Sequence, residues 1–330
     1  MHATGKSRVD TKEETRMKRL LLSAAAVLCM AGTAHAEKIG VSMALFDDNF
    51  LTVLRNGMIA QAKGMAGVEL QVEDAQNDVA KQLDQIKNFA ASGVTAIIVN
   101  PVDTSATQAM SDAAAAAKIP LVYVNRQPIN VDTLPDNQAF VASNEADSGT
   151  LETKEICKLL KAAGKTEANV YVMMGELSNQ AAVQRTKDIH EVIAGPDCGV
   201  KINIIDEQTA NWSRDQAQNM MTNWMSAGKP FDALIANNDE MAIGAIQAMK
   251  AAKVDMKVMI VGGVDATQDA LAAMAAGDLD ATVFQNAAGQ GAGALDAALK
   301  LAKGEKVDKK VYIPFELVTP ENLANYQKKN

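Results

Sequence analysis

The sequence predicts an α/β protein built from two doubly wound parallel sheets. Short apolar runs alternate with segments of helical periodicity from residue 38 onward. Strands separated by helices of about 10–15 residues are typical of parallel sheets with both faces covered. At 330 residues the chain exceeds the usual size of a single core. A polar stretch over 127–138, with Pro128 and Pro135, divides the runs into two sets. We therefore expect two Rossmann-like lobes.

The elements of the first lobe follow from the two periodicities. Short apolar runs predict buried strands, and apolar residues spaced three and four apart predict helices. The expected strands are 39–45, 68–72, 94–99, 121–124 and 140–142, and the expected helices are 50–65, 79–91 and 105–118.

The second lobe repeats this pattern after a helix over 151–163. Its expected strands are 170–174, 200–205, 233–236, 258–261 and 281–284, and its expected helices are 181–194, 213–227, 241–252, 268–276 and 287–303. A strand-like tail over 311–318 is expected to end the globular part.

The stretch 234–249 shows the strand-to-helix junction on which the functional prediction depends. An apolar run gives way to NNDE (237–240), followed by apolar residues at helical spacing. Asp239 is the expected N-cap, because its carboxylate can accept a hydrogen bond from the free N–H groups of the first turn. Asn238 is thereby placed at the carboxyl end of a strand, where open α/β sheets bind ligands.

The N-terminal region has the three parts of an export signal. Residues 17–19 (MKR) are basic, 20–30 are apolar, and 34–36 (AHA) fit the cleavage motif. The apolar part is shorter than the roughly 20 residues of a membrane helix. We expect a signal peptide over about 17–36, a mature chain from Glu37 and localisation in the periplasm. The polar residues 1–16 are unlike such a signal, which indicates Met17 as the initiator.

Charge and residue content exclude several function classes. From Glu37 onward the chain carries 26 basic and 37 acidic residues, a net charge of −11, which disfavours nucleic-acid phosphates as a target. His190 is the single histidine there, so hydrolase and zinc motifs lack their parts. Cys157 and Cys198 remain after the leader. They can form a disulfide in an oxidising compartment, and two separate buried thiols are the alternative.

Polar and aromatic side chains recur where the expected strands end. Taken singly, each is more often a cap, a turn residue or a surface charge. Together they offer amides, carboxylates and guanidinium groups for hydroxyls, and aromatic rings for C–H faces. They include no nucleophile–base pair, so the pattern favours a binding site for a neutral polyhydroxylated molecule. These residues are Phe46, Asp48, Phe50, Asn100, Asn125, Arg126, Trp212, Asn238, Asp265 and Gln285.

Several stretches are similar to the ribose-binding branch of the periplasmic sugar-binding proteins, and the similarity covers 38–318. They are IIVNPVDTSA (97–106), VNRQP (124–128), AAVQR (181–185), ANWSRDQA (210–217), NNDEMAIGA (237–245), VGGVDAT (261–267) and ATVFQ (281–285). FDDNFLTVLRNGM (46–58) and MGELSNQAAVQRTK (174–187), with VNRQP, more closely resemble the members for myo-inositol and for rhizopine, an inositol amine.

The resemblance implies a type I periplasmic binding protein, with two lobes joined by three hinge strands near 143–144, 285–286 and 314–315. The N-terminal lobe would comprise 37–143 and 286–314, and the C-terminal lobe 144–285 and 315–330. Ribose binders have Asn, Phe and Asp where this chain has Asp48, Leu51 and Asn125. These departures indicate another ligand, and Phe46 is expected to replace the ring lost at Leu51. The implied ligand-binding residues are Phe46, Asp48, Phe50, Asn100, Asn125, Arg126, Arg185, Trp212, Asn238, Asp265 and Gln285.

The implied function is the substrate-binding component of an ABC transporter that closes on a cyclitol. The ligand is myo-inositol or an inositol amine such as rhizopine, and the residues do not separate these two. A pentose or hexose such as ribose, allose or galactose is the alternative. The implied partners are this ligand and an ABC permease of the inner membrane, with a chemoreceptor as a further candidate. No cofactor, metal or nucleic acid is expected, and the protein is expected to be a monomer.

Two other classes of protein share parts of this pattern. A NAD-dependent enzyme would fit the G-x-G-x-x-A match at 289–294, but a lone match is weak. It begins four residues after a strand and lies within an expected helix, where small residues favour close packing. A sugar-responsive transcription regulator would need a helix-turn-helix before residue 38, where the chain has an export signal instead.

Overall fold

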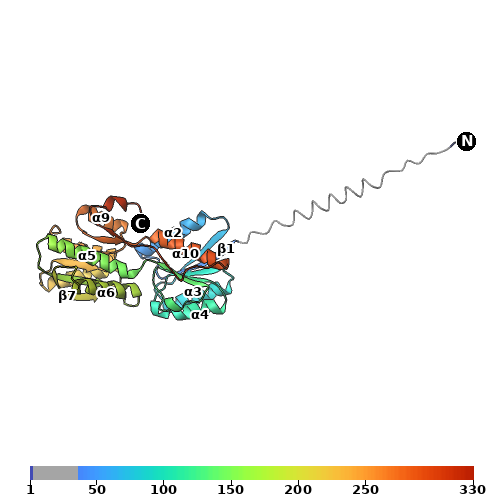
Figure 1. The fold of residues 1–330 in the computed structure, drawn as a ribbon, viewed down its shortest axis with the longest axis horizontal. Coiled ribbons are helices and arrows are strands. Elements are labelled where there is room, and N and C mark those ends of the chain that lie inside the picture. Colours follow the sequence, from blue (N-terminus) through green and yellow to red (C-terminus); the bar gives the residue numbers. More distant parts are fainter. Residues whose placement is uncertain (3–35) are drawn as a thin grey trace. The chain divides into compact units, whose positions relative to one another are not determined.

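The structure is a computed structural model that describes residues 1–2 and 36–330. The chain forms two units, 1–36 and 37–330, and all elements described below belong to the second (Figure 1). The predicted signal peptide lies outside the described residues except for Ala36. Of the helices in the described part, none is both long enough and apolar enough to cross a membrane.

A six-stranded parallel sheet forms the centre of what we call the first lobe. Its strand order is β11-β5-β4-β3-β1-β2. Helices α2 and α10 pack on one face and α3 and α4 on the other. Neighbouring residues of β3 alternate between these two cores, as in a strand buried on both sides. The elements are β1 (Glu37–Met43), α2 (Asn49–Lys63), β2 (Val68–Asp74), α3 (Val79–Ala91), β3 (Ala96–Val99), α4 (Thr107–Ala116), β4 (Leu121–Val124), β5 (Gln138–Ala142), α10 (Ala287–Ala302) and β11 (Lys310–Tyr312), with short 3-10 turns at Thr104–Ala106 and Val131–Thr133.

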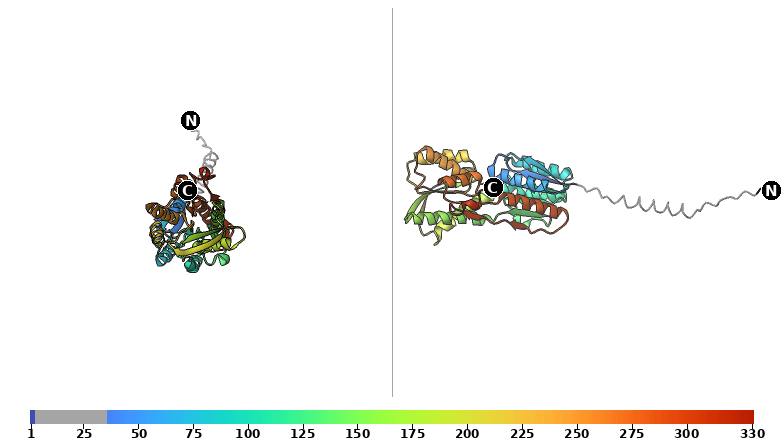
Figure 2. Two further views of the ribbon diagram at one scale, coloured as in Figure 1. Left: turned by 90° about the vertical axis from the view of Figure 1, so that its left-hand side faces the viewer. Right: turned by 90° about the horizontal axis from the view of Figure 1, so that it is seen from above.

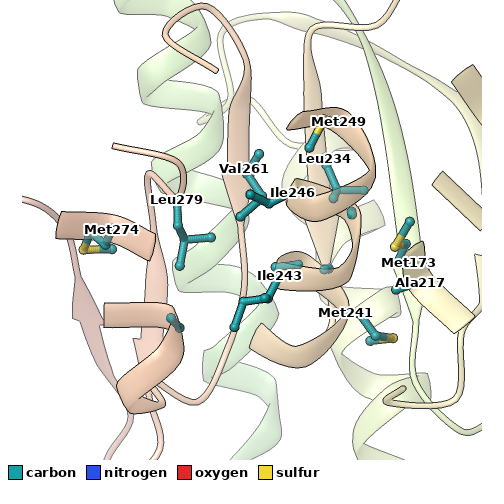
Figure 3. Packing of buried hydrophobic residues seen from close by; sticks show 14 of the residues in the cluster. Met173, Ala217, Leu234, Met241, Ile243, Ile246, Met249, Val261, Met274 and Leu279 are labelled. Atoms are coloured by element: carbon teal, nitrogen blue, oxygen red, sulfur yellow. The ribbon is translucent and has the colours of Figure 1, made fainter. Parts of the chain in front are cut away.

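A four-stranded parallel sheet of order β7-β6-β8-β9 forms the second lobe. Helices α5 and α6 cover one face, and α7, α8 and α9 cover the other, where Leu234, Ile246 and Val261 meet (Figure 3). Single bridges extend this sheet toward β10, which pairs antiparallel with β12. The elements are α5 (Glu145–Ala162), β6 (Glu167–Met174), α6 (Gln180–Ala194), β7 (Lys201–Thr209), α7 (Arg214–Ser226), β8 (Ala233–Ala236), α8 (Asp239–Ala251), β9 (Ile260–Gly262), α9 (Gln268–Ala276), β10 (Thr282–Phe284), β12 (Glu316–Val318) and a 3-10 turn at Leu323–Asn325.

The chain passes between the two lobes three times. Residues 143–144 join β5 to α5, 285–286 join β10 to α10, and 313–315 join β11 to β12. Figure 2 shows most of the green-to-orange elements in one lobe and the blue and cyan elements in the other, where α10 also lies. The prediction of one strand over 311–318 was wrong: it is divided around Pro314, which cannot donate to a ladder. We propose the lobe boundaries at these three crossings.

Two local predictions were settled by the packing. Asn238, not Asp239, is the N-cap of α8, since its side chain accepts from Met241 N while Asp239 lies in the first turn. The carboxylate of Asp239 is buried and accepts from Thr282 Oγ1 and Thr267 N instead. The glycine-rich match at 289–294 lies within α10, as expected. A Cβ on Gly291 would lie 2.6 Å from the Leu54 carbonyl oxygen, so small residues allow α10 to approach α2.

The two cysteines whose pairing the sequence does not decide form a disulfide. Cys157 lies on α5 and Cys198 follows α6, and both are buried in the core beneath these helices. The bond closes a segment of 41 residues. Because α5 and α6 cover one face of the second sheet, the crosslink joins α5 to the segment that follows α6 on this face.

Candidate ligand-binding cavity

A cavity lies between the two lobes, and the space not occupied by atoms within it, counted together with adjoining space open to solvent, is about 370 Å³. It lies beyond the carboxyl ends of strands from both sheets, as expected for open α/β folds. Within its lining there is no histidine, cysteine or lysine. The lining residues are Asp48, Phe50, Leu51, Asn125, Arg126, Glu145, Asn179, Ala181, Arg185, Trp212, Asn238, Asp265 and Gln285.

Three of these polar residues are held in place as helix N-caps. Asp48 caps α2, Asn179 caps α6 and Asn238 caps α8, each accepting a backbone N–H with a side-chain oxygen. In Asp48 this oxygen accepts from Leu51 N at 2.7 Å. The cap leaves the second carboxylate oxygen of Asp48 free, and it leaves the amide nitrogen of each asparagine free to donate. Local sequence therefore orients acceptor and donor groups toward the cavity.

Arg126 provides the cationic group of the first lobe. It directly follows Asn125, which has a left-handed backbone (φ 67°) at the end of β4. Nη1 of Arg126 donates to the carbonyl oxygens of Pro101 and Val102 at 3.1 and 3.3 Å. It also lies 3.5 Å from Glu176 Oε2 of the second lobe. The guanidinium group is thus buried, oriented by its own lobe and paired across the cleft.

Arg185 connects the cavity to all three crossings. Its Nε and Nη2 donate to the two carboxylate oxygens of Glu145 at 2.7 and 3.1 Å. Nη2 also lies 3.4 Å from Gln285 Oε1, and the guanidinium carbon lies 5.9 Å from the Phe315 ring centroid. Glu145 follows the first crossing, Gln285 lies in the second and Phe315 in the third. A bidentate pair of this kind fixes the plane of the guanidinium group.

Trp212 forms an aromatic wall on the second lobe. Its backbone is left-handed (φ 61°), and its ring centroid lies 5.6 Å from the guanidinium carbon of Arg185. A Cβ at position 175 would lie 2.2 Å from the ring, so only glycine at Gly175 leaves room for it. Phe50 supplies a second ring from the first lobe. Such rings can pack against the C–H faces of a ligand.

Asp265 brings a buried carboxylate into the cavity. Its backbone has φ 125°, an uncommon conformation for a residue other than glycine, of a kind that collects at ligand sites. Burial raises the pKa of Asp265 well above its usual range, against the opposing effect of Arg185. Burial also raises the pKa of Asp48, opposed by the Leu51 N–H and Arg126. Within the described residues, no group donates a hydrogen bond to the Asp265 carboxylate, so it is available to a ligand.

The structure brings nine of the eleven expected residues to this cavity. They are Asp48, Phe50, Asn125, Arg126, Arg185, Trp212, Asn238, Asp265 and Gln285. Asn100 lies behind the lining and is fully buried. Its Nδ2 donates to Val124 O and Asn125 Oδ1 at 3.2 and 3.3 Å, and its Oδ1 accepts from Ala44 N. Asn100 is thus placed to orient Asn125.

Phe46 lies outside the lining, in contrast to the expectation that it replaces the ring lost at Leu51. Arg55 covers its ring at 4.1 Å from the centroid, and the Phe46 carbonyl accepts from Thr52 Oγ1 at 2.8 Å. These contacts hold the residue against α2, where it packs on the core of the first lobe. Leu51 itself lines the cavity, next to Phe50.

Three further lining residues were not among the candidates: Glu145, Asn179 and Ala181. A signal existed for two of them. Glu145 follows the fifth expected strand by three residues, as the other candidates follow theirs, and Asn179, of a residue type favoured at N-caps, lies two positions before the expected helix 181–194. Ala181 had no such signal, because a small apolar side chain is recognised as lining only from the tertiary structure.

The described residues contain no group of three or more His, Cys, Asp or Glu side chains placed to hold a metal ion. The carboxylates of the cavity are instead interleaved with arginines and amides. Such a lining can bind a polar organic molecule by many hydrogen bonds at once.

Comparison with known proteins gives matches over the whole of both lobes. Residues 39–306 match the family described as periplasmic binding protein domain. The chain is 64% identical over 314 residues to a protein of Rhizobium meliloti with the provisional name rhizopine-binding protein, covering 95% of this chain and 100% of that one.

Two solved structures are also similar to this chain. One is an ABC transporter solute binding protein from Bacillus halodurans with bound myo-inositol. Its TM-score is 0.83 at 39% identity, covering 91% of this chain and 100% of that chain. The other is the Caulobacter myo-inositol binding protein bound to myo-inositol. Its TM-score is 0.78 at 28% identity, covering 90% of this chain and 97% of that chain.

Proposed function

The chain belongs to the periplasmic binding protein family, and on this basis we propose that it is the substrate-binding component of an ABC transporter for a cyclitol. It is a binding protein and not an enzyme, in keeping with its family. The proposed ligand is myo-inositol or an inositol amine such as rhizopine. The ligand would be held between the lobes and would favour their closed arrangement by its higher affinity for it.

The observation that carries this proposal is the chemistry of the cavity lining. Buried donors and acceptors from both lobes surround one space together with Phe50 and Trp212. Each hydroxyl of a cyclitol is both donor and acceptor, so a ring of hydroxyls matches a lining of mixed amides, carboxylates and guanidinium groups. Exclusion of water strengthens each such bond. The two relatives solved with myo-inositol support the assignment.

The charges of the cavity favour an amine-bearing cyclitol over a neutral one. Both cavity arginines are paired with glutamates, at 3.5 Å for Arg126 and 2.7 Å for Arg185. Asp48 and Asp265 are in no ion pair within the described residues. An ammonium group on the ligand would counter the burial of these two carboxylates. We propose that it adds affinity to what the hydroxyls supply.

Export and transport complete the proposal. The expected signal peptide would direct the chain to the periplasm, where the mature protein would start at Glu37. The partner would be an ABC permease of the inner membrane that accepts the closed, loaded form. N-terminal sequencing of protein recovered from a periplasmic extract tests this step. Intact residues 17–36 on the recovered protein would contradict it.

The test of ligand class is a thermal-shift and calorimetry panel. It contains myo-inositol, scyllo-inosamine, ribose, allose, galactose and NAD. A cyclitol at a hundred times its dissociation constant should stabilise the protein by about 2.7 kcal/mol. Larger effects of ribose or allose than of every cyclitol would replace the proposal by the pentose or hexose alternative. A response to NAD alone would contradict the whole assignment.

A further inference from the structure

A second, outer cavity lies at the opening between the lobes. Its space, counted together with adjoining space open to solvent, is about 770 Å³, and it shares Asp48, Arg126 and Trp212 with the inner cavity. Its remaining lining includes Glu176 and Glu240 of the second lobe, neither of which lines the inner cavity. Both glutamates reach across the opening to residues of the first lobe. These contacts suggest a role that does not involve touching the ligand.

Glu176 makes the first of these contacts. Its Oε1 accepts from Asn77 Nδ2 of the first lobe at 2.8 Å, and its Oε2 lies 3.5 Å from Arg126 Nη1. Glu176 follows β6, and Asn77 follows β2 with a left-handed backbone (φ 58°). One carboxylate thus holds two groups of the opposite lobe. Hydrogen bonds to a charged group are stronger than those between neutral groups.

Glu240 makes the second contact, from the first turn of α8. Its Oε1 accepts from Asn49 Nδ2 of the first lobe at 2.9 Å. Nε and Nη2 of Arg214, from its own lobe, donate to the two oxygens at 2.9 Å each. Arg214 therefore fixes the carboxylate in the direction of Asn49. Asn49 is the first residue of α2, so the positive end of that helix dipole adds to the attraction.

A third contact between the lobes supports this arrangement. Thr104 N and Oγ1 both donate to Ser178 O, at 3.1 and 3.0 Å, and Gln180 N donates to Thr104 Oγ1 at 3.2 Å. Thr104 precedes α4 in the first lobe, and Ser178 precedes α6 in the second. The two lobes are therefore bridged at three separate places. Two of the three depend on a glutamate of the second lobe.

We propose that Glu176 and Glu240 form a latch that sets how long the closed protein retains its ligand. They are positioning residues, since they act on the lobes and, through Arg126, on the cavity. Their contacts to Asn49, Asn77 and Arg126 join the lobes, so these contacts are lost when the lobes open, while Arg214 keeps its pair with Glu240. The latch would lower the free energy of the closed form with any ligand, and its loss would appear mainly in the dissociation rate. This inference rests on the proposed function.

The test replaces Asn49 and Asn77, the first-lobe residues that the two glutamates contact. In the double variant Asn49→Asp and Asn77→Asp, each new carboxylate faces a glutamate and keeps the shape of the original side chain. Aspartate tolerates the left-handed backbone at position 77. Stopped-flow kinetics should show dissociation roughly tenfold faster or more, with association changed little. The unfolding temperature of the ligand-free protein should not change, whereas a role in folding either lobe would lower it.

Asn211→Asp is the matched control. Asn211 lines the same outer cavity and also has a left-handed backbone (φ 52°), but its side chain contacts Thr209 and Gln216 of its own lobe. Ligand should dissociate from the Asn211→Asp variant at a rate within twofold of that of the parent. Equal rates for the parent and the double variant would overturn the latch. So would an equal acceleration by Asn211→Asp, because added negative charge alone would then explain it.

The dissociation rates are measured with the compound of the panel that binds the parent protein most tightly. The test of the latch therefore does not depend on whether that compound is a cyclitol. Single-molecule energy transfer between dyes on Lys87→Cys and Lys257→Cys, one exposed position on each lobe, measures the closed fraction without ligand. That fraction should fall in the double variant and not in the control. If the double variant changes neither the closed fraction nor the dissociation rate, the inference is refuted even where the cyclitol proposal holds.

Discussion

Arg185 Nε lies 2.7 Å from Glu145 Oε2, and both side chains are buried where the first crossing meets the cavity. The pair links a residue that faces the ligand space to the chain segment on which relative movement of the lobes depends. The same guanidinium group also contacts Gln285 and Phe315 at the other two crossings. Occupation of the cavity is therefore structurally connected to the segments that join the lobes.

Glu145→Gln is expected to destabilise the protein by about 3 kcal/mol, because it leaves the buried Arg185 without its charged partner. Urea unfolding of the ligand-free protein measures this change. Glu191→Gln is the control, since Glu191 pairs with Lys187 at an exposed site where ion pairs contribute little. A loss no greater than that of the control would show that Asp265 and other carboxylates near Arg185 can take over the role of Glu145.

Asp265→Asn should separate the two cyclitol classes. The substitution removes the negative charge but keeps a hydrogen-bonding side chain. Affinity for an inositol amine should fall by roughly a hundredfold and affinity for myo-inositol by roughly tenfold, because a charge-assisted bond is lost only in the first case. Calorimetry with both ligands gives the ratio. Asp84→Asn, in an exposed pair with Lys87, should leave both affinities unchanged. Equal losses for the two ligands would argue against an ammonium-binding role for Asp265.

Asp188 should make stability depend on pH. Burial raises the pKa of Asp188 from 3.8 to about 7, and its Oδ2 has no hydrogen-bond partner among the described residues. The folded protein therefore favours the protonated form. The stabilisation that protonated Asp188 contributes to the folded protein is fully present below pH 4 and is lost as the pH rises toward 7. Asp188→Asn should gain about 3 kcal/mol over the parent between pH 4 and 7.5.

The measurement is urea unfolding at several pH values, comparing Asp188→Asn with the parent at each. Asp136→Asn, at a fully exposed position, should show no pH-dependent difference. A constant difference across the pH range for Asp188→Asn would mean that this group is ionised alike in the folded and unfolded states.

Gly175→Ala should weaken ligand binding with little effect on the fold. The added Cβ would lie 2.2 Å from the ring of Trp212, and this half-buried ring can move away from the cavity. Affinity should fall by roughly a hundredfold, since the stacking wall is displaced, while the unfolding free energy should change by about 1 kcal/mol or less. Tryptophan fluorescence in a Trp224→Phe background reports the ring directly. An unchanged Trp212 spectrum together with full affinity would contradict this account.

Much of the fold could be predicted because parallel strands are buried on both faces. The apolar runs at 121–124 and 233–236 coincide with β4 and β8. The tail was harder, since Val311 and Leu317 have similar apolar character yet belong to different lobes. Asp239 was taken as a cap because Asp and Asn are equally good caps. The buried partners Thr267 and Thr282, far away in sequence, decide between them.

The sequence by itself determined the alternation of strands and helices, and with it the edge of each sheet at which polar residues collect. Periodicity and capping are local properties that neighbouring residues suffice to define. Only the tertiary structure decided that Phe46 lies outside the cavity, that Asn100 stands behind Asn125 and that Glu145 holds Arg185. It also decided which glutamates meet asparagines across the opening. These contacts join residues up to 191 positions apart, and the distance between them depends on how the two lobes pack together.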